Sequence, residues 1–452
     1  MPLNHRTSMT DLYQLTMAAG YFEKGFDLVS TFELFVRNLP ENRSYLVSAG
    51  VNQCLEYLQN MSFKADEIEY IRNHPSFKNV SDEFFSYLKQ FRFTGDVYAM
   101  EEGTLFFPDE PVIRVTAPAI QAQLVETYLL SQFNFQTLIA SKAARIKSVA
   151  GNCAVIEFGT RRAHSPEAGL LAARAAFVGG CDGTSNVLAG IEYGIPTYGT
   201  MAHSWVMAYE TEDEAYRAYT DVFPESNALL IDTYDTVEAA KKIVKYDYNV
   251  SSVRLDSGNI EKLSKQVREI FDRSGKKDIK IIVSGDLNEY KIKELLEKYA
   301  PVDIFGVGTE LSTSKDAPAL SGVYKLVQQE RNSRVEYKAK FSENKKTYPA
   351  KKQVYRYKDQ NGYFNHDLIA KEDEIINGYT MTLLKPAIKD GIITENFDMN
   401  IDNARNRCLE SMKCLPEQYK NIKYPSEYPV EISENLYKIA RELEKKYLKV
   451  LN

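Results

Sequence analysis

The sequence predicts an α/β protein: an irregular (β/α) barrel, with an N-terminal α/β sheet domain before it and a C-terminal extension after it. Short apolar runs recur from residue 154 onward and alternate with amphipathic helical patterns. This alternation is typical of parallel strands joined by right-handed crossovers. The pattern differs on both sides of this stretch, so we expect domains over residues 1–130, 131–328 and 329–452.

The N-terminal part begins with a helical pattern over residues 11–22, DLYQLTMAAGYF, which carries one apolar face. Residues 93–115 instead alternate in the manner of strands and are interrupted by Gly and Pro, which predicts a sheet. Residues 120–146 then have helical spacing over a length that favours two consecutive helices.

Eight apolar runs are candidates for the barrel strands, and eight parallel strands with intervening helices indicate a (β/α)8 barrel. They span residues 154–159, 175–180, 196–200, 228–233, 252–258, 280–286, 302–309 and 322–327. The stretch is short for this fold, and the connection over residues 310–322 has no helical pattern. We therefore expect an irregular barrel, with an open doubly wound sheet as the alternative.

The C-terminal extension is rich in Lys and Tyr. Its Asp359–Gly362 turn, flanked by aromatic residues, predicts a β-hairpin. The amphipathic pattern over residues 434–450 predicts a terminal helix.

The bulk composition limits the function classes. The net charge is −6 and the pI is about 5.7, which argues against a general nucleic-acid binder. The five cysteines form no CxxC pair, which fits a reducing compartment. The N-terminus shows no apolar signal sequence, and no run reaches the ~18 apolar residues of a membrane helix. We expect a soluble cytoplasmic protein.

Polar residues gather where the predicted strands end, and the active site of a βα barrel lies at the carboxyl ends of its strands. Each of them alone is explained by helix capping, but seven such ends together favour a site. Arg161 and Arg162 offer guanidinium forks for a carboxylate or phosphate. His164 and His203 are candidates for acid–base or covalent chemistry.

Two further groups predict anion and metal chemistry. Small residues in Ser284-Gly285 and in Gly306, Gly308 and Thr309 let backbone N–H groups approach a phosphate. Carboxylates suited to Mg²⁺ follow several strands, namely Asp232, Asp235, Asp256 and Asp286, of which Asp232 and Asp256 are the stronger candidates. No zinc-type ligand spacing and no GxSxG nucleophile motif is found.

With these residues in place, the chain closely resembles the nicotinate phosphoribosyltransferase family over nearly its whole length. The similarity is carried by a set of motifs in that family's order. They are TDLYQLTM, EGTLFFPDEPVIRV, FGTRRAHSPEAG, GGCDGTSN, GTMAHSW, VRLDSG, SGDLNE, FGVGTEL and KKTYPAKKQVYR. The last motif departs from the family pattern, because Ala350 stands where we expect Gly.

The resemblance implies a reaction. The family transfers the phosphoribosyl group of 5-phosphoribosyl 1-diphosphate to nicotinate, forming nicotinate mononucleotide and pyrophosphate in NAD salvage. ATP hydrolysis is coupled through a phosphohistidine, which by motif position is His203. The implied cofactors are Mg²⁺ and the co-substrate ATP, and the implied assembly is a homodimer that shares active sites.

The resemblance also assigns roles by position. Phe158 and Tyr13 would sandwich the pyridine ring, with the tyrosine coming from the partner subunit. Arg161 and Arg254 would bind the carboxylate or phosphates, and Thr200 would lie beside nicotinate. Asp232 and Asp256 would face the ribose or magnesium, and Gly306, Gly308 and Thr309 would hold the 5′-phosphate. The remaining expected substrate-binding residues are Asp182, Ser284 and Gly285.

Two other functions remain open at this stage. A nicotinamide phosphoribosyltransferase has the same architecture, although TDLYQ rather than TDSYK favours nicotinate. A non-catalytic phosphosugar-binding barrel would also use the polar strand ends, but it would not need His203.

Overall fold

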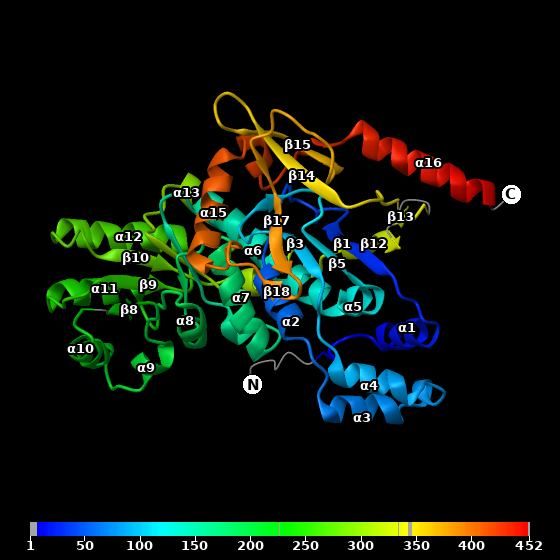
Figure 1. Ribbon diagram of the computed structural model, residues 1–452. Helices are drawn as coiled ribbons and strands as arrows, with labels where there is room; N and C mark the ends of the chain where they lie inside the picture. The colour runs from blue at the N-terminus through cyan, green and yellow to red at the C-terminus, as the bar shows by residue number, and fades with distance from the viewer. Residues whose placement is uncertain (1–6, 226, 333, 342–345, 451–452) are drawn as a thin grey trace. The chain divides into compact units, whose positions relative to one another are not determined.

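The computed structural model describes residues 7–225, 227–332, 334–341 and 346–450. The chain forms two compact units (Figure 1). Unit 1 comprises Met1–Leu138 and Ala319–Asn452, and unit 2 comprises Ile139–Pro318. Among the described residues, no helix is both long enough and apolar enough to cross a membrane.

Unit 1 contains a seven-stranded sheet, a four-stranded sheet, a two-stranded sheet and surrounding helices. Its helices are α1 (Leu12–Glu23), α2 (Val51–Asn60), α3 (Ala65–Asn73), η1 (Pro75–Phe77), α4 (Asp82–Gln90), α5 (Ala119–Leu124), α15 (Ile401–Cys414), η3 (Glu417–Lys420) and α16 (Glu434–Val450), and α6 (Glu126–Ala150) continues into unit 2. The helices predicted over residues 11–22, 120–146 and 434–450 are confirmed, the middle one as the predicted pair.

The seven-stranded sheet has the order β13-β12-β1-β5-β3-β17-β18, and all its neighbours are antiparallel. Its strands are β1 (Val29–Val36), β3 (Asp96–Met100), β5 (Ile113–Pro118), β12 (Gly322–Arg331), β13 (Arg334–Tyr337), β17 (Leu384–Lys389) and β18 (Ile392–Ile393). The smaller sheets contain β2 (Leu46–Val47), β4 (Leu105–Phe106), β14 (Lys352–Lys358), β15 (Phe364–Lys371), β16 (Met381–Thr382) and β19 (Val430–Ile432). β14 and β15 pair antiparallel, which confirms the predicted hairpin.

The prediction that residues 322–327 form the last barrel strand is wrong. These residues begin β12, which pairs antiparallel with β1 in unit 1. The rings of Phe32 and Tyr324 stack with centroids 4.9 Å apart, and the Tyr324 hydroxyl donates to the carbonyl of Ala122 at 2.7 Å. These contacts bury the run against β1 and α5.

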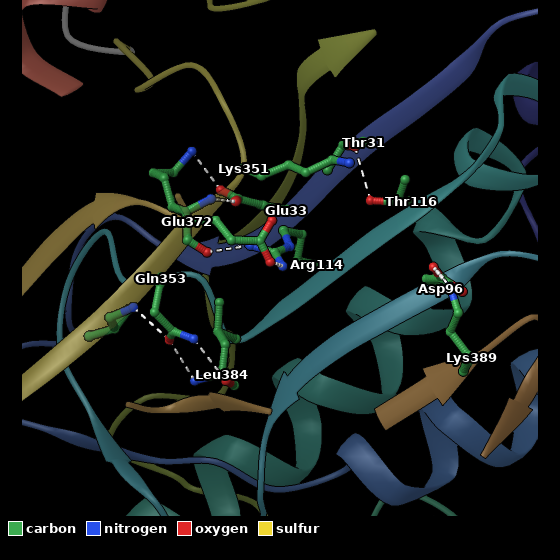
Figure 2. Close-up of polar contacts among 12 residues, drawn as sticks. Thr31, Glu33, Asp96, Arg114, Thr116, Lys351, Gln353, Glu372, Leu384 and Lys389 are labelled. Atoms are coloured by element: carbon green, nitrogen blue, oxygen red, sulfur yellow. Dashed lines mark hydrogen bonds and ion pairs between the residues drawn. The ribbon is translucent and has the colours of Figure 1, made fainter. Parts of the chain in front are cut away.

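Polar side chains connect the sheets of unit 1 (Figure 2). The Gln353 side chain of β14 donates to the carbonyl of Leu384 on β17 at 2.9 Å and accepts from its N–H at 3.0 Å. The Arg114 guanidinium of β5 donates to the Lys352 carbonyl at 2.7 Å and also bonds to the Glu372 carboxylate. The C-terminal strands therefore complete the N-terminal sheet.

Unit 2 is built on a six-stranded, all-parallel sheet with the order β7-β6-β11-β10-β9-β8. Its strands are β6 (Ala154–Glu157), β7 (Gly183–Thr184), β8 (Ala228–Leu230), β9 (Ser252–Leu255), β10 (Lys280–Val283) and β11 (Ile304–Val307). Figure 1 shows β8, β9 and β10 side by side. The helices are η2 (Thr160–Arg162), α7 (Pro166–Val178), α8 (Val187–Tyr193), α9 (His203–Met207), α10 (Glu212–Val222), α11 (Thr236–Lys245), α12 (Ile260–Arg273), α13 (Glu289–Glu297) and α14 (Thr309–Ser312).

The parallel sheet is linear in its strand order, with β7 at one edge and β8 at the other. The two edge strands, β7 and β8, are consecutive along the chain, and β6 pairs with both β7 and β11. Residues 196–200 contribute only a single parallel bridge, between Thr197 and Thr184. Within the described residues no ladder joins this segment to β8, so the sheet is α/β and parallel but a closed barrel is not confirmed.

The predicted strand at 175–180 is also wrong, because residues 175–178 belong to α7. Ser165 caps this helix by accepting the N–H of Ala168, and Pro166 occupies its first turn. The run LLAARAAFV is rich in alanine, the strongest helix former, so a continuous apolar stretch here is a buried helix. The parallel sheet has six strands where eight were predicted, which explains why this stretch of sequence is short for a (β/α)8 barrel.

Ala350 has a backbone conformation that favours glycine. Its φ is +71°, its side chain is fully buried, and its N–H donates to the carbonyl of Val327 at 3.0 Å. An L-residue in this region costs about 1–2 kcal/mol. This is the position at which the family resemblance predicts Gly.

We expect Ala350→Gly to leave the free energy of unfolding within about 1 kcal/mol of the parent, because released strain offsets the lost methyl burial. Ala350→Val should destabilise by about 3 kcal/mol, because a β-branched residue fits neither this φ nor the closed space. Scanning calorimetry of both variants checks the ranking. Equal melting temperatures for Ala350→Val and Ala350→Gly would show that residue 350 does not keep its positive φ in solution.

Candidate active site

The polar residues at the carboxyl ends of the parallel strands divide into two groups. The first group caps helices: each side-chain oxygen accepts the N–H of the residue three positions later. Its members are Asn186, Asp235, Asn259 and Asn288. Asp235 is therefore a helix cap, and of the four candidate carboxylates it is the one explained by capping. The second group lies directly after the strands and its members contact one another.

Arg254, the third residue of β9, holds the second group together. Its Nε donates to Ser284 Oγ at 2.8 Å, its Nη1 to Thr200 Oγ1 at 3.0 Å and its Nη2 to Asp256 Oδ1 at 2.6 Å. The guanidinium also lies 5.8 Å from the centroid of the Phe158 ring. A guanidinium has five N–H donors, so two remain for a ligand.

The Asp256 carboxylate is kept ionised by its neighbours. Burial alone would raise its pKa, but the hydrogen bond from Ser284 and the charge and hydrogen bond of Arg254 outweigh burial, so the pKa lies below its ordinary value. His203 lies close enough for its positive form to act in the same direction. The Asp256 carboxylate is therefore negative near neutral pH.

Two glycines bring these segments close together. Gly285 has a φ of +94°, and a Cβ there would lie 2.2 Å from the carbonyl oxygen of Asp256. A Cβ on Gly306 would lie 2.5 Å from Cδ2 of the Phe158 ring. Both positions therefore exclude side chains, and Gly306 makes room for the ring that flanks the site.

Asp232 follows the edge strand β8, and His203 lies on the segment between β7 and β8. Asp232 Oδ2 accepts the N–H of Asp256 at 2.9 Å and the hydroxyl of Ser257 at 2.6 Å. Its Oδ1 is buried and has no hydrogen-bond partner. His203 begins α9, and its Nδ1 lies 3.1 Å from the hydroxyl of Thr233, which directly follows Asp232. Nε2 is the nitrogen left for other chemistry.

A cavity of ≈ 300 Å³ opens beside this cluster, a size suited to a small ligand. It is lined by Phe158, Thr160, Arg161, Ser185, Gly199, Thr200 and Arg254. The aromatic ring and the two arginines give it one flat apolar wall and a cationic side. Such a lining suits a small planar anion.

Several predicted residues stand apart from the cluster. Asp182 bonds to Lys147 at 2.7 Å and accepts the N–H of Val155, at the amino end of β6. It lines a second cavity, of ≈ 310 Å³, that also reaches Phe158 and Thr200. Arg162 and His164 are exposed and do not line the first cavity.

The remaining candidates lie close by in the chain but make other contacts. The Asp286 carbonyl accepts from Lys291 at 2.8 Å, and its side chain makes no hydrogen bond to the cluster. Gly308 precedes the short helix α14, and its carbonyl accepts the N–H groups of Leu311 and Ser312. Thr309 begins that helix.

Tyr13 belongs to unit 1. Its side chain is 49% exposed, and its hydroxyl accepts from Gln14 at 2.9 Å. Burial of the hydroxyl, reinforced by the nearby Glu126 charge, raises its pKa. The ring is therefore available to a partner molecule rather than committed to the core.

Sequence reasoning missed Thr160, Ser185, Thr233 and Glu157. The first two lie inside motifs that were identified, but Ser and Thr there are equally explained by capping. Glu157 is fully buried; it accepts the Thr184 hydroxyl at 2.6 Å and the N–H of Gly159, which fixes the turn that presents Phe158. Burial raises the pKa of Glu157. The sequence signal for Glu157 was a carboxylate within an otherwise apolar strand.

Comparison with known proteins gives a consistent result over nearly the whole chain. The family models for the nicotinate phosphoribosyltransferase (NAPRTase) N-terminal domain, family and C-terminal domain match residues 9–134, 153–350 and 375–440. The chain is 39% identical over 434 residues to a nicotinate phosphoribosyltransferase of Mycobacterium tuberculosis (strain ATCC 25618 / H37Rv), covering 94% of this chain and 91% of that protein. It is also 39% identical over 460 residues to the Bacillus subtilis (strain 168) enzyme, covering 95% and 93%.

The fold agrees with a solved structure. The crystal structure of human nicotinic acid phosphoribosyltransferase matches with a TM-score of 0.84 and 25% identity, over 96% of this chain and 99% of that one. The parallel sheet, the cluster around Arg254 and these similarities together show that the chain belongs to the nicotinate phosphoribosyltransferase family.

Proposed function

We propose that this protein transfers the phosphoribosyl group of 5-phosphoribosyl 1-diphosphate to nicotinate, giving nicotinate mononucleotide and pyrophosphate. The observation that carries the proposal is Arg254. It joins the strand ends and lines, with Phe158 and Arg161, a cavity sized for a small planar anion. The relatives named above are nicotinate phosphoribosyltransferases, which supports the same substrate.

The cavity accounts for recognition of the base. The Phe158 ring offers a face on which a pyridine ring can stack. Arg161 and the two free N–H donors of Arg254 can hold the nicotinate carboxylate, because a guanidinium matches a carboxylate bidentately. Nicotinamide has no charge to pair with these groups. This binding orients the ring nitrogen, whose free lone pair attacks the anomeric carbon of the sugar without a general base.

The carboxylates account for the transition state. As pyrophosphate leaves, positive charge develops on the ribose ring, and the carboxylate of Asp256, whose pKa is lowered, would stabilise it together with the neighbouring Asp232. Asp232 is held in place by the Asp256 N–H and the Ser257 hydroxyl. Because these contacts are preformed, little reorganisation is needed during the reaction.

The residues fit a magnesium ion bound through few protein ligands. Asp232 Oδ1 is a buried oxygen without a partner, and Mg²⁺ in such sites takes one or two carboxylates while substrate phosphates and water complete its shell. No cluster of three metal-binding side chains exists among the described residues, which agrees with this mode. When bound, Mg²⁺ would supply positive charge against the diphosphate.

We further propose that ATP hydrolysis is coupled through His203. The Nδ1 atom is engaged by Thr233, so the ring is oriented. The imidazole attacks the γ-phosphorus of ATP, the bond from that phosphorus to the bridging oxygen breaks, and ADP leaves. Water later hydrolyses the N–P bond. The phosphorylated ring carries up to two added negative charges beside Asp256, which changes the local electrostatics during the cycle.

We also propose a homodimer that shares its active sites. The apolar side chains exposed on and just before α1 are Met9, Leu12, Tyr13 and Met17, with exposures of 40–49%. A face of this kind is suited to burial against a second copy. Tyr13 would then stack on the pyridine ring bound in the partner's cavity.

Turnover with each base tests the substrate. We expect nicotinate mononucleotide when the protein is mixed with phosphoribosyl diphosphate, Mg²⁺, ATP and nicotinate, and at least about 100-fold lower kcat/KM with nicotinamide, since it cannot use the charge pair. Product formation is followed by chromatography. Preference for nicotinamide would support the amide-specific alternative, and no product with either base would support a phosphosugar-binding protein.

Replacement of His203 by Ala should abolish the stimulation of synthesis by ATP while leaving slow transfer without ATP, because the base and sugar contacts are untouched. Rates with and without ATP, and acid-labile labelling from γ-³²P-ATP, measure this. His164→Ala is the matched control, since that ring is exposed outside the cavity. Full ATP stimulation in His203→Ala would rule out the covalent role.

Ser284→Ala should move the acidic limb of the pH profile of kcat/KM to higher pH. The lost hydrogen bond is one that lowers the pKa of Asp256, so the carboxylate would protonate at higher pH and the ionised form would be lost earlier as pH falls. Ser185→Ala, which removes a hydroxyl from the cavity beside Phe158 and no described contact of Asp256, should leave the limb in place. In an Asp256→Asn background, Ser284→Ala should no longer change the acidic limb of the pH profile. A shift of the limb in this double variant would show that a group other than Asp256 is responsible for it.

A further inference from the structure

Unit 2 contains a buried ion network that the proposed reaction does not use. Lys142 and Arg145 lie about one turn apart on α6, Glu289 begins α13, and Asp316 lies shortly after the end of α14. The side chains of Lys142, Arg145 and Glu289 are buried, and that of Asp316 is 23% exposed. Glu289 is the last residue of the SGDLNE motif, so one motif carboxylate has no role in the site described above.

Lys142 joins two carboxylates that come from different connections of the sheet. Its Nζ lies 2.8 Å from Glu289 Oε2 and 2.9 Å from Asp316 Oδ1. The Nε of Arg145 lies 3.0 Å from the other oxygen of Glu289, Oε1. The four formal charges of this network sum to zero. Loss of one partner is costly in such a network, because the other charge stays buried without compensation.

The two carboxylates end two loops that leave the sheet side by side. β10 and β11 are parallel neighbours, so their carboxyl ends lie at the same edge. The first loop comprises residues 284–288 and leads to Glu289, and the second comprises residues 308–315, including α14, and leads to Asp316. Both strand-end loops contain the small residues whose backbone N–H groups are expected to approach a phosphate.

Each strand-end loop holds one non-glycine residue in the left-handed region of the backbone. Asp286 has a φ of +47° in the first loop, and Ser314 has a φ of +42° in the second. Residues in this region persist only where the surrounding structure holds them. The two loops therefore need contacts from outside to keep their shape, and the ion network supplies one contact at the end of each loop.

We propose that Lys142 is a positioning residue for substrate binding. By pairing with Glu289 and Asp316, it fixes both strand-end loops in the shape in which their backbone N–H groups bind the phosphate groups of 5-phosphoribosyl 1-diphosphate. One ammonium has three donors, so it can bond to two carboxylates at once and fix the loops relative to each other as well as to α6. The proposal rests on the function proposed above.

Asp316→Ala tests the proposal, because it breaks the contact to the second loop and leaves the more deeply buried pairs of Glu289 in place. We expect KM for phosphoribosyl diphosphate to rise about 10-fold with kcat within about twofold of the parent, since a looser loop weakens ground-state and transition-state binding alike. KM for nicotinate should change by less than about twofold. The reason is that Phe158 and Arg161 follow β6 and belong to neither strand-end loop.

Two further variants distinguish positioning from general stability. Asp316→Glu keeps the carboxylate and should return KM for phosphoribosyl diphosphate towards the parent value. Asp272→Ala is the matched control, because it also removes a carboxylate paired with a cation in unit 2, Arg268 at 2.8 Å, but at the end of α12 that precedes β10. It should leave both KM values unchanged. A folded Asp316→Ala protein with the parent's KM for phosphoribosyl diphosphate, or a rise that Asp272→Ala reproduces, would overturn the proposal.

Hydrogen exchange of the free protein tests the loop positions without the reaction. Exchange should become faster in residues 308–316 of Asp316→Ala, and in residues 284–288 as well when Lys142→Met removes the shared cation, while β9 keeps the parent's protection. If Lys142→Met does not fold, the Asp316 variants decide the question. A parent that forms no mononucleotide would defeat the function proposed above, whereas unchanged exchange in Asp316→Ala would defeat the positioning role in either case.

Discussion

The guanidinium of Arg254 is the interaction on which the candidate active site depends. A single planar cation contacts Asp256 on its own segment and joins it to two other segments, through Ser284 and Thr200. It sets the spacing of the strand ends and also keeps Asp256 ionised despite partial burial. The same group borders the cavity where a ligand carboxylate would bind. One side chain therefore both holds the strand ends together and lines the cavity, and its planar fork directs three donors to acceptors on different sides, which a compact ammonium does not.

The alternation of strands and helices was predictable because each parallel strand is an apolar run and each helix has a periodic face. Five of the eight predicted strand runs contain strands of the parallel sheet, and β7 was missed because two residues carry no pattern. The errors have physical causes. The buried, alanine-rich part of α7 is a continuous apolar run, and a buried strand has the same pattern. The strand β12 was assigned to the wrong sheet because its partner, β1, is far away in the sequence, and the residues of β12 alone do not indicate which strand they pair with.

The candidate site was predictable by position and less so by role. Polar residues directly after a strand, such as Asp232 and Asp256, contact one another, whereas those a few residues later cap the next helix, as Asp235 and Asn259 do. Composition does not distinguish the two groups; distance from the strand end does. Asp182 precedes its strand and so lies at the amino end of β6.

The weak attachment of one segment to the parallel sheet has a mechanical consequence. The segment that carries Thr200 and His203 is joined to the sheet by one bridge, between Thr197 and Thr184, instead of by a ladder. A strand paired on both sides must lose several backbone hydrogen bonds to move, whereas this bridge consists of two, from Thr184 N–H to the Pro196 carbonyl and from Tyr198 N–H to the Thr184 carbonyl. Displacement of the segment therefore breaks fewer backbone hydrogen bonds than displacement of a strand.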